Sequence, residues 1–155
     1  RRVASIAMVH ETLASSSTER VAFDEVFDRI ITNAIELSSR PIDIRIEGLF
    51  DEFDSQVATP LALVVTELIH NAIEHGLEQR GDYLRVAVKR DERTCSITIA
   101  DNGAGLPADF SIVASSNLGL QIVRTLTENE LKGTIEINRV GEETQAHLVF
   151  QTKAS

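Results

Sequence analysis

Three polar side chains, Glu67, Asn71 and His75, recur every four residues within an apolar segment of the chain. In a helix such residues lie on one face, with about 5–6 Å between Cβ atoms. Carboxylate and amide oxygens suit Mg²⁺, which usually takes one or two ligands from protein while phosphates and water supply the rest. The stripe is therefore a candidate edge for a metal-bound phosphate, although a solvated helix face would carry the same residues.

A second candidate site follows directly after the apolar residues 96–100, where Asp101 leads into Gly103 and Gly105. A carboxylate at a buried strand end can accept a hydrogen bond from an exocyclic amine such as N6 of adenine. Glycines let the backbone turn sharply and approach a flat ring or a phosphate closely. An ordinary glycine-rich turn is the alternative, but the position at a strand end favours a binding site.

Two further segments carry weaker signals. Ser116 or Asn117 could cap a helix whose free N–H groups would form a phosphate site. Gly119 in its first turn costs about 1 kcal/mol relative to Ala, and either close approach of a ligand or tight helix packing would explain it. Thr144, near the start of the last strand, could contact a base directly or through water, or could be there for its β propensity.

These side chains must be positioned by an alternation of helices and strands. Apolar periodicity predicts helices over residues 3–13, 24–37 (with Asp24 as N-cap), 59–78 (with Thr59 as N-cap and Pro60 at the first helical position) and about 117–127. Alternating residues predict strands over 42–46, 84–88, 97–101, 135–137 and 148–150, and residues 51–55 are expected to form a loop or a short strand end. The order of these elements predicts an α+β fold, a two-layer α/β sandwich whose mixed, mainly antiparallel sheet is covered by helices and preceded by a helical segment.

Composition limits the function classes. The length of 155 residues fits one ordinary domain. A net charge of −9 argues against wide contact with nucleic acid, although a nucleotide remains possible. The single cysteine, Cys95, lies in an alternating apolar run and is expected to be buried and inert, which suits a reducing cytoplasm. We expect no membrane contact, because no run approaches roughly 18 apolar residues.

Taken in order, the motifs resemble the GHKL superfamily of ATPases, which binds ATP in the Bergerat fold. Residues 67–75 match its N-box, residues 101–105 its first glycine box, residues 117–123 its second glycine box, and Thr144 the threonine of its last hairpin. The sequence departs from the family pattern at Ser116, where the leading glycine of the second box is expected, and at Glu143, which replaces the glycine usual before the threonine.

The resemblance implies ATP and Mg²⁺ as cofactors. Asp101 would bind the adenine amine, Asn71 would coordinate Mg²⁺, and His75 would lie near the ribose or phosphates. Glu67 stands where gyrase-like members carry the base that activates water, whereas many histidine kinases have Asn there. The remaining residues implied to contact the nucleotide are Gly103, Gly105, Leu118, Gly119, Leu120 and Thr144.

Residues 2–13 and 118–126 look more specifically like HWE-related sensor histidine kinases. The resemblance implies that residues 1–20 end a dimerisation and phosphotransfer hairpin and that residues 21–155 form the ATP-binding catalytic domain. In that family the acceptor histidine lies on the preceding helix, in a basic motif that this sequence does not contain. His10 falls in an apolar stripe with Val3, Ile6 and Leu13, so we interpret it as a packed residue.

The implied reaction transfers the γ-phosphoryl of MgATP to that histidine and then to a response regulator, within a full-length homodimer. This stretch is expected to bind ATP without autophosphorylating. An anti-sigma-factor serine kinase is the main alternative, but it would reach the N-box helix without the helical pair of residues 3–37. A degenerate nucleotide-binding domain that only contacts partners is the other.

Overall fold

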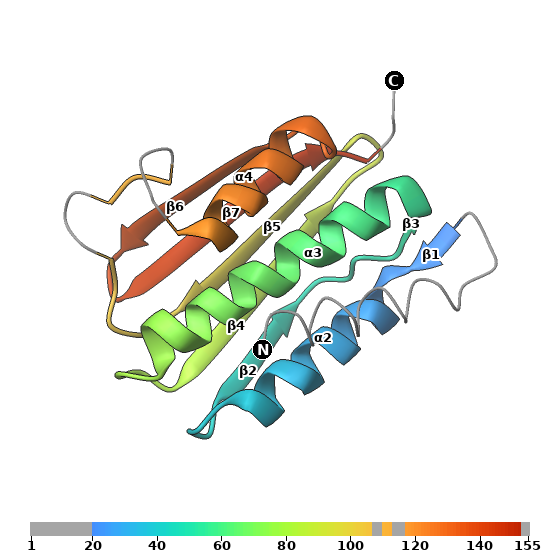
Figure 1. The fold of residues 1–155 in the computed structure, drawn as a ribbon. Helices are drawn as coiled ribbons and strands as arrows, with labels where there is room; N and C mark the ends of the chain where they lie inside the picture. The colour runs from blue at the N-terminus through green and yellow to red at the C-terminus, as the bar shows by residue number, and fades with distance from the viewer. Residues whose placement is uncertain (1–19, 107–109, 113–116, 153–155) are drawn as a thin grey trace.

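The computed structural model describes residues 20–106, 110–112 and 117–152. Its main sheet has the strand order β2-β4-β5-β7-β6, in which β2 runs parallel to β4 and the other neighbours are antiparallel. Helices α2, α3 and α4 lie together on one face of this sheet (Figure 1). The fold class is the one predicted, a two-layer α+β sandwich. The strands are β2 (Asp43–Glu47), β4 (Tyr83–Arg90), β5 (Thr94–Asp101), β6 (Thr134–Val140) and β7 (Glu143–Gln151), and the helices are α2 (Phe23–Leu37), α3 (Ser55–Asn71) and α4 (Leu118–Asn129).

The core lies between the helices and the inward face of the sheet. Alternate residues of the central strands point inward and are buried, as the period of two in a strand requires. They include Leu84, Val86, Val88, Ile97, Ile99, Leu148 and Phe150. Cys95 belongs to the same set and is buried, as predicted, and burial raises the pKa of its thiol to about 11, which disfavours the reactive thiolate.

The central helix α3 is continued by a π-helical segment, η1 (Ala72–Leu77). Together they are long and apolar enough to cross a membrane by length and composition, but 72% of the apolar window is buried inside the fold. This is how the core helix of a folded domain behaves. It is also why α3 can hold polar residues at fixed positions beside the sheet.

Two predicted helix starts were wrong. Helix α3 begins at Ser55, directly after the short strand β3 (Glu52–Asp54), so Thr59 is not its N-cap and Pro60 lies inside it. Pro60 falls in the second turn, where its missing N–H removes one intrahelical hydrogen bond while its ring is buried in the core. Helix α2 begins at Phe23, so Asp24 lies in its first turn, and its carboxylate accepts hydrogen bonds from the N–H groups of Phe50 and Asp51, both at 2.9 Å.

Other local predictions were confirmed. Residues 51–55, predicted to be a loop or a short strand end, contain β3, which pairs with β1 (Arg20–Ala22) in a separate two-stranded sheet. Asn117 is the N-cap of α4, and its side chain accepts a hydrogen bond from the N–H of Leu120 at 3.0 Å. The alternative cap Ser116 and the apolar stripe of Val3, Ile6, His10 and Leu13 lie outside the described residues.

Candidate functional site

A cavity of about 360 Å³ opens between the helix layer and the sheet. It is bounded by α3, η1 and α4 on one side and by the inward faces of β5, β6 and β7 on the other. Six of the residues predicted from sequence line it, namely Asn71, His75, Asp101, Gly105, Leu120 and Thr144. The helix cap predicted at Asn117 also lines it. The rest of the lining is largely apolar and was not predicted: Leu68, Ala72, Gly76, Ile99, Leu106, Phe110, Ile137 and Ala146.

Asp101 is the buried acid of the cavity. It ends β5, is 4% exposed, and accepts a hydrogen bond from the N–H of Gly103 at 2.9 Å. Burial raises the pKa of its carboxyl to about 6, because desolvation outweighs the opposing effects of the Gly103 N–H and the nearby Arg139. Thr144 is its direct cross-strand partner on β7. The Asp101 carboxylate and the Thr144 hydroxyl therefore lie side by side in the cavity wall.

The glycines near Asp101 are explained by close packing of backbone. A Cβ added to Gly76 would lie 3.0 Å from Cγ of Asp101 and closer still to Oδ1. A Cβ on Gly103 would overlap the backbone of Gly76, and the N–H of Ala104 donates to the carbonyl oxygen of Gly76 at 3.2 Å. The first glycine box thus allows the end of β5 to sit directly against η1. Sequence reasoning missed Gly76, although a glycine inside the predicted helix, directly after His75, was a visible signal.

Asn71 has the polar side chain best placed to receive a ligand. Its Oδ1 and Nδ2 are buried, and neither has a hydrogen-bond partner among the described residues. Leaving such groups unsatisfied costs about 1–3 kcal/mol, so an amide of this kind usually has a function. Asn71 ends α3 and lines the cavity, and the exposed His75 lines it one turn further along. The two residues therefore form a polar edge beside the apolar wall.

Glu67, Leu118 and Gly119 do not line the cavity. Glu67 is 9% exposed and packs against Gly119. A Cβ added to Gly119 would lie 3.1 Å from Cγ of Glu67 and closer still to its carboxylate. Tight packing between α3 and α4 is therefore the explanation for Gly119. Leu118 is 73% exposed on the outside of α4.

Arg139 on β6 is a residue of the site that sequence reasoning missed. Its Nη1 donates to Thr144 Oγ1 at 3.0 Å and to the carbonyl oxygen of Gly103 at 3.3 Å. Arg139 and Thr144 are cross-strand partners in the last hairpin. A two-residue turn at Gly141-Glu142 sets the pairing of the two strands that it joins. This signal in the sequence could have predicted that Arg139 lies opposite Thr144.

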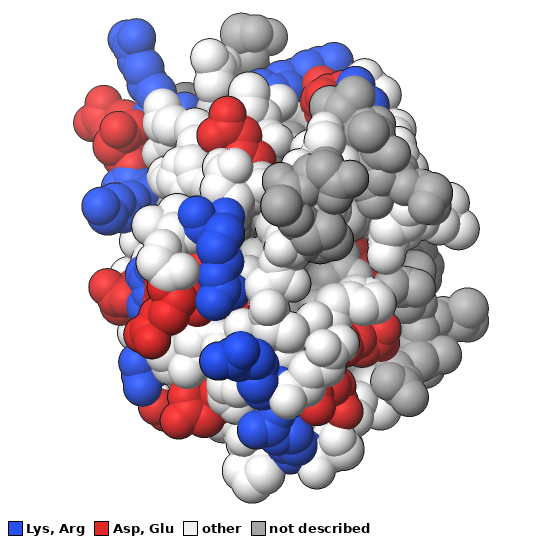
Figure 2. All heavy atoms as spheres, turned by 90° about the vertical axis from the view of Figure 1, so that its left-hand side faces the viewer, with Lys and Arg blue, Asp and Glu red and all other residues white. Residues whose placement is uncertain are grey.

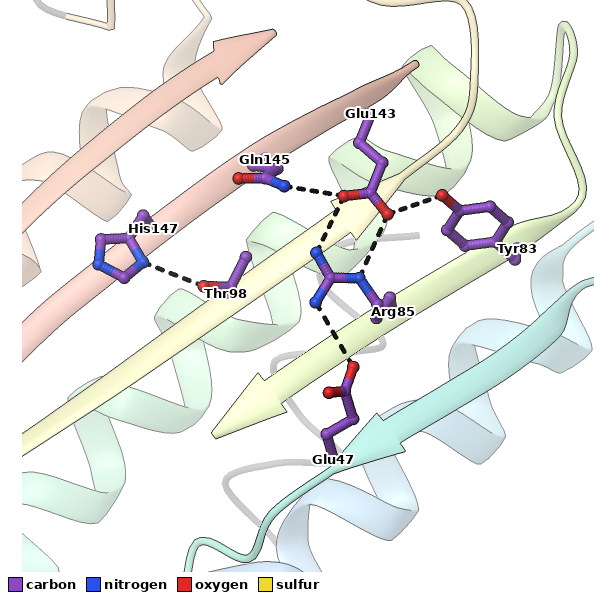
Figure 3. A network of polar contacts seen from close by, with 7 residues as sticks. All are labelled: Glu47, Tyr83, Arg85, Thr98, Glu143, Gln145 and His147. Carbon is purple, nitrogen blue, oxygen red and sulfur yellow. Dashed lines mark hydrogen bonds and ion pairs between the residues drawn. The ribbon is translucent and has the colours of Figure 1, made fainter. Parts of the chain in front are cut away.

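Behind the site, Glu143 anchors the start of β7 on the outer face of the sheet (Figure 3). It accepts hydrogen bonds from the Tyr83 hydroxyl at 2.6 Å, from Arg85 Nη2 at 2.9 Å and from Gln145 Nε2 at 2.8 Å. These donors, Arg85 first, lower the pKa of Glu143 to about 2, and the bond to Glu143 raises the pKa of Tyr83 to about 12. The glutamate that replaces the family's glycine is thus built into this network.

The end of the molecule where β5 ends and β7 begins carries mixed charge. Lys and Arg side chains are interleaved there with Asp and Glu (Figure 2). The described residues on this face form no broad basic surface of the kind that contact with a phosphate backbone would need.

Comparison with known proteins decides the family. Residues 56–154 match the family of histidine kinase-, DNA gyrase B- and HSP90-like ATPases, and residues 1–38 match a histidine kinase family. The chain belongs to the histidine kinase-, DNA gyrase B- and HSP90-like ATPases. Within this ATPase family it is a catalytic domain of the sensor histidine kinase type, as its motifs indicated.

Sensor histidine kinases are among the relatives of this ATPase domain. It is 45% identical over 139 residues to sensor histidine kinase PdtaS of Mycobacterium tuberculosis, which is 87% of this chain and 28% of that protein. It is 42% identical over 144 residues to PdtaS of Mycolicibacterium smegmatis, covering 90% of this chain and 29% of that one. The chain thus spans less than a third of these curated relatives.

A solved structure confirms the Bergerat fold. The histidine kinase domain of the Erythrobacter litoralis EL346 blue-light activated histidine kinase superimposes with a TM-score of 0.85 at 18% identity. The alignment covers 98% of this chain and 75% of that one.

Proposed function

We propose that the cavity binds MgATP and that the domain transfers its γ-phosphoryl to a histidine outside residues 1–155, from which it passes to a response regulator. The observation that carries the proposal is the pairing, in one cavity, of a buried carboxylate at Asp101 with the unsatisfied amide of Asn71. The first can select an amine-bearing base, and the second can take part in binding a metal-bound phosphate. The name of PdtaS, a sensor histidine kinase, supports the same assignment.

Each end of the cavity has its own task. Asp101 would accept from the adenine amine, and Thr144 could reach the same base, directly or through water. The apolar wall, including Ile99 and Ala146, would exclude water around the ring. Asn71 and His75 would contact the ribose and phosphates, with Asn71 as the protein ligand of Mg²⁺. Bound Mg²⁺ would neutralise charge that develops on the phosphates.

Phosphoryl transfer asks the protein mainly for positioning and charge stabilisation. The acceptor is an imidazole, which is nucleophilic when neutral, so the site needs no strong base. We further propose that residues 1–20 are the end of a helical hairpin, and that the whole kinase acts as a cytoplasmic homodimer. Residues 21–155 would then present ATP to the acceptor of that hairpin.

Calorimetry tests the nucleotide site. MgATP should bind the wild-type chain, and Asp101→Ala should weaken binding by at least about tenfold, since a lost hydrogen bond to a charged group costs about 1.5–3 kcal/mol. Glu136→Ala, which removes an exposed carboxylate from β6, is the control and should leave the dissociation constant unchanged. No measurable heat with the wild type, or undiminished heat after Asp101→Ala, would refute the proposal.

The chemical lability of the phosphate tests the reaction class. With the acceptor helix supplied, labelled ATP should give an acid-labile phosphohistidine, whereas a serine kinase would give an acid-stable product. The chain by itself should carry no stable phosphate.

A further inference from the structure

Glu67 lies one helical turn before Asn71, but the two side chains face different neighbours. Asn71 lines the cavity, whereas Glu67 is buried against the first turn of α4. An added Cβ at residue 119 would overlap the Glu67 carboxylate, so a side chain there would require this buried carboxylate to shift. The N-box helix and α4 are therefore interlocked at this point.

The start of α4 contacts both the cavity and helix α3. Asn117 and Leu120 line the cavity, and Gly119 between them is buried against Glu67. The turn contains no acidic residue of its own. A carboxylate brought from α3 therefore supplies the negative charge that favours the positive end of a helix dipole.

We propose that Glu67 is a positioning residue whose carboxylate fixes the first turn of α4, and through it the cavity wall formed by Asn117 and Leu120, so that Glu67 sets nucleotide affinity. This inference rests on the proposed function for its effect on ATP. A general base would have to reach the reacting group. Glu67 does not line the cavity and packs against α4. Its position therefore suits holding α4 in place rather than proton transfer.

A double-mutant cycle between Glu67 and Gly119 tests the contact. Gly119→Ala alone should lower the melting temperature and weaken MgATP binding by about tenfold, because the methyl group displaces the carboxylate and moves α4. In a Glu67→Ala background the same Gly119→Ala change should raise the melting temperature, since the space is free and alanine favours helix over glycine. In that background, Gly119→Ala should not weaken MgATP binding beyond the effect of Glu67→Ala alone. Thr125→Ala, on the exposed face of α4, is the control: it should leave MgATP binding unchanged and should shift the melting temperature by the same small amount in both backgrounds, since alanine favours helix over threonine.

The conservative variant separates positioning from acid–base chemistry. Glu67→Gln keeps the volume and one oxygen, and should restore most of the affinity and melting temperature lost in Glu67→Ala. Additive effects of the two alanine changes on melting temperature would overturn the inference. So would a Glu67→Gln variant that binds MgATP like the wild type but no longer phosphorylates a supplied acceptor histidine. The melting cycle needs no nucleotide, so it decides the contact even if the wild type fails to bind ATP and the proposed function falls.

Discussion

Asp101 is a residue at which stability and binding make opposite demands. It is 4% exposed at the end of β5, and burial raises its pKa from 3.8 to about 6. At neutral pH the folded protein therefore holds a carboxylate in an environment that favours the neutral form. Such groups are common where a charge is needed for binding rather than for folding.

This conflict predicts the behaviour of Asp101→Asn. A carboxyl whose folded pKa lies above its unfolded value contributes stability below the unfolded pKa, and that contribution is lost as pH rises through the folded pKa. Without nucleotide, Asp101→Asn should thus be more stable than the wild type at pH 7.5, by on the order of 1–2 kcal/mol. The difference should shrink to near zero at about pH 4, while ATP binding is weakened at every pH. Denaturant unfolding between pH 4 and 8 measures this, and a difference independent of pH would contradict it.

The glycines show what can and cannot be predicted at the scale of residues. Residue types and order identified Asp101, Asn71 and Thr144, because their chemistry is local to each motif. The sequence left two explanations open for Gly119, ligand approach and helix packing, and it did not give the packing partner of either Gly103 or Gly119. Each is required by a residue far along the chain, Gly76 in one case and Glu67 in the other, and only the packed structure brings these pairs together.

At the scale of elements, the outer face of the sheet joins strands that are distant in sequence. Glu143 on β7 is bound by Tyr83 and Arg85 on β4, and Arg85 also reaches Glu47 on β2 at 3.5 Å (Figure 3). Arg85 and Glu143 are largely shielded from solvent, with side chains 25% and 13% exposed. The network therefore ties the start of β7, next to Thr144, to the parallel half of the sheet.

Glu143→Gln should reveal the strength of this network. Its pKa is lowered from 4.5 to about 2, chiefly by Arg85, so its ionised form stabilises the fold above the unfolded pKa and loses that effect as pH falls through about 2. Glu143→Gln should destabilise the protein by on the order of 2 kcal/mol at pH 7, and by progressively less from pH 4.5 down to pH 2. The exposed Glu136→Gln is the matched control on β6 and should show no such loss. Equal unfolding free energies for wild type and Glu143→Gln at pH 7 would contradict the assignment.

Alternation and turn residues predicted the five strands of the main sheet, because these signals depend on neighbours in sequence, but no strand was predicted at β1. The start of α3 was missed because the Thr59–Pro60 pair is a good local start signal, whereas the helix begins four residues earlier, directly after β3. The predicted helix covered η1 (Ala72–Leu77), but its π-helical character was missed because these six residues carry no periodic signal of their own. It places Gly76 against Asp101 and brings His75 into the cavity lining, so this irregular element shapes the site.

At the scale of the whole molecule, charge limits how a metal can bind. The chain carries a net charge of −9, yet no group of three or more His, Cys, Asp or Glu side chains is arranged for a metal within the described residues. The proposed protein ligand is the neutral amide of Asn71. Most of the charge that holds Mg²⁺ would therefore have to come from the nucleotide phosphates.

This argument predicts an ordered dependence of stability on ligands. Millimolar Mg²⁺ alone should leave the melting temperature nearly unchanged, ATP with EDTA should raise it slightly, and MgATP should raise it most. A ligand present at 100 times its dissociation constant adds about 2.7 kcal/mol to the stability of the folded state, so the MgATP shift should be several degrees. In Asn71→Ala the difference between ATP with EDTA and MgATP should largely vanish, while the shift due to ATP alone persists, because base recognition by Asp101 is intact. A large shift from Mg²⁺ alone would show that the protein binds the metal without nucleotide. It would contradict the proposal that Asn71 and the phosphates together hold Mg²⁺.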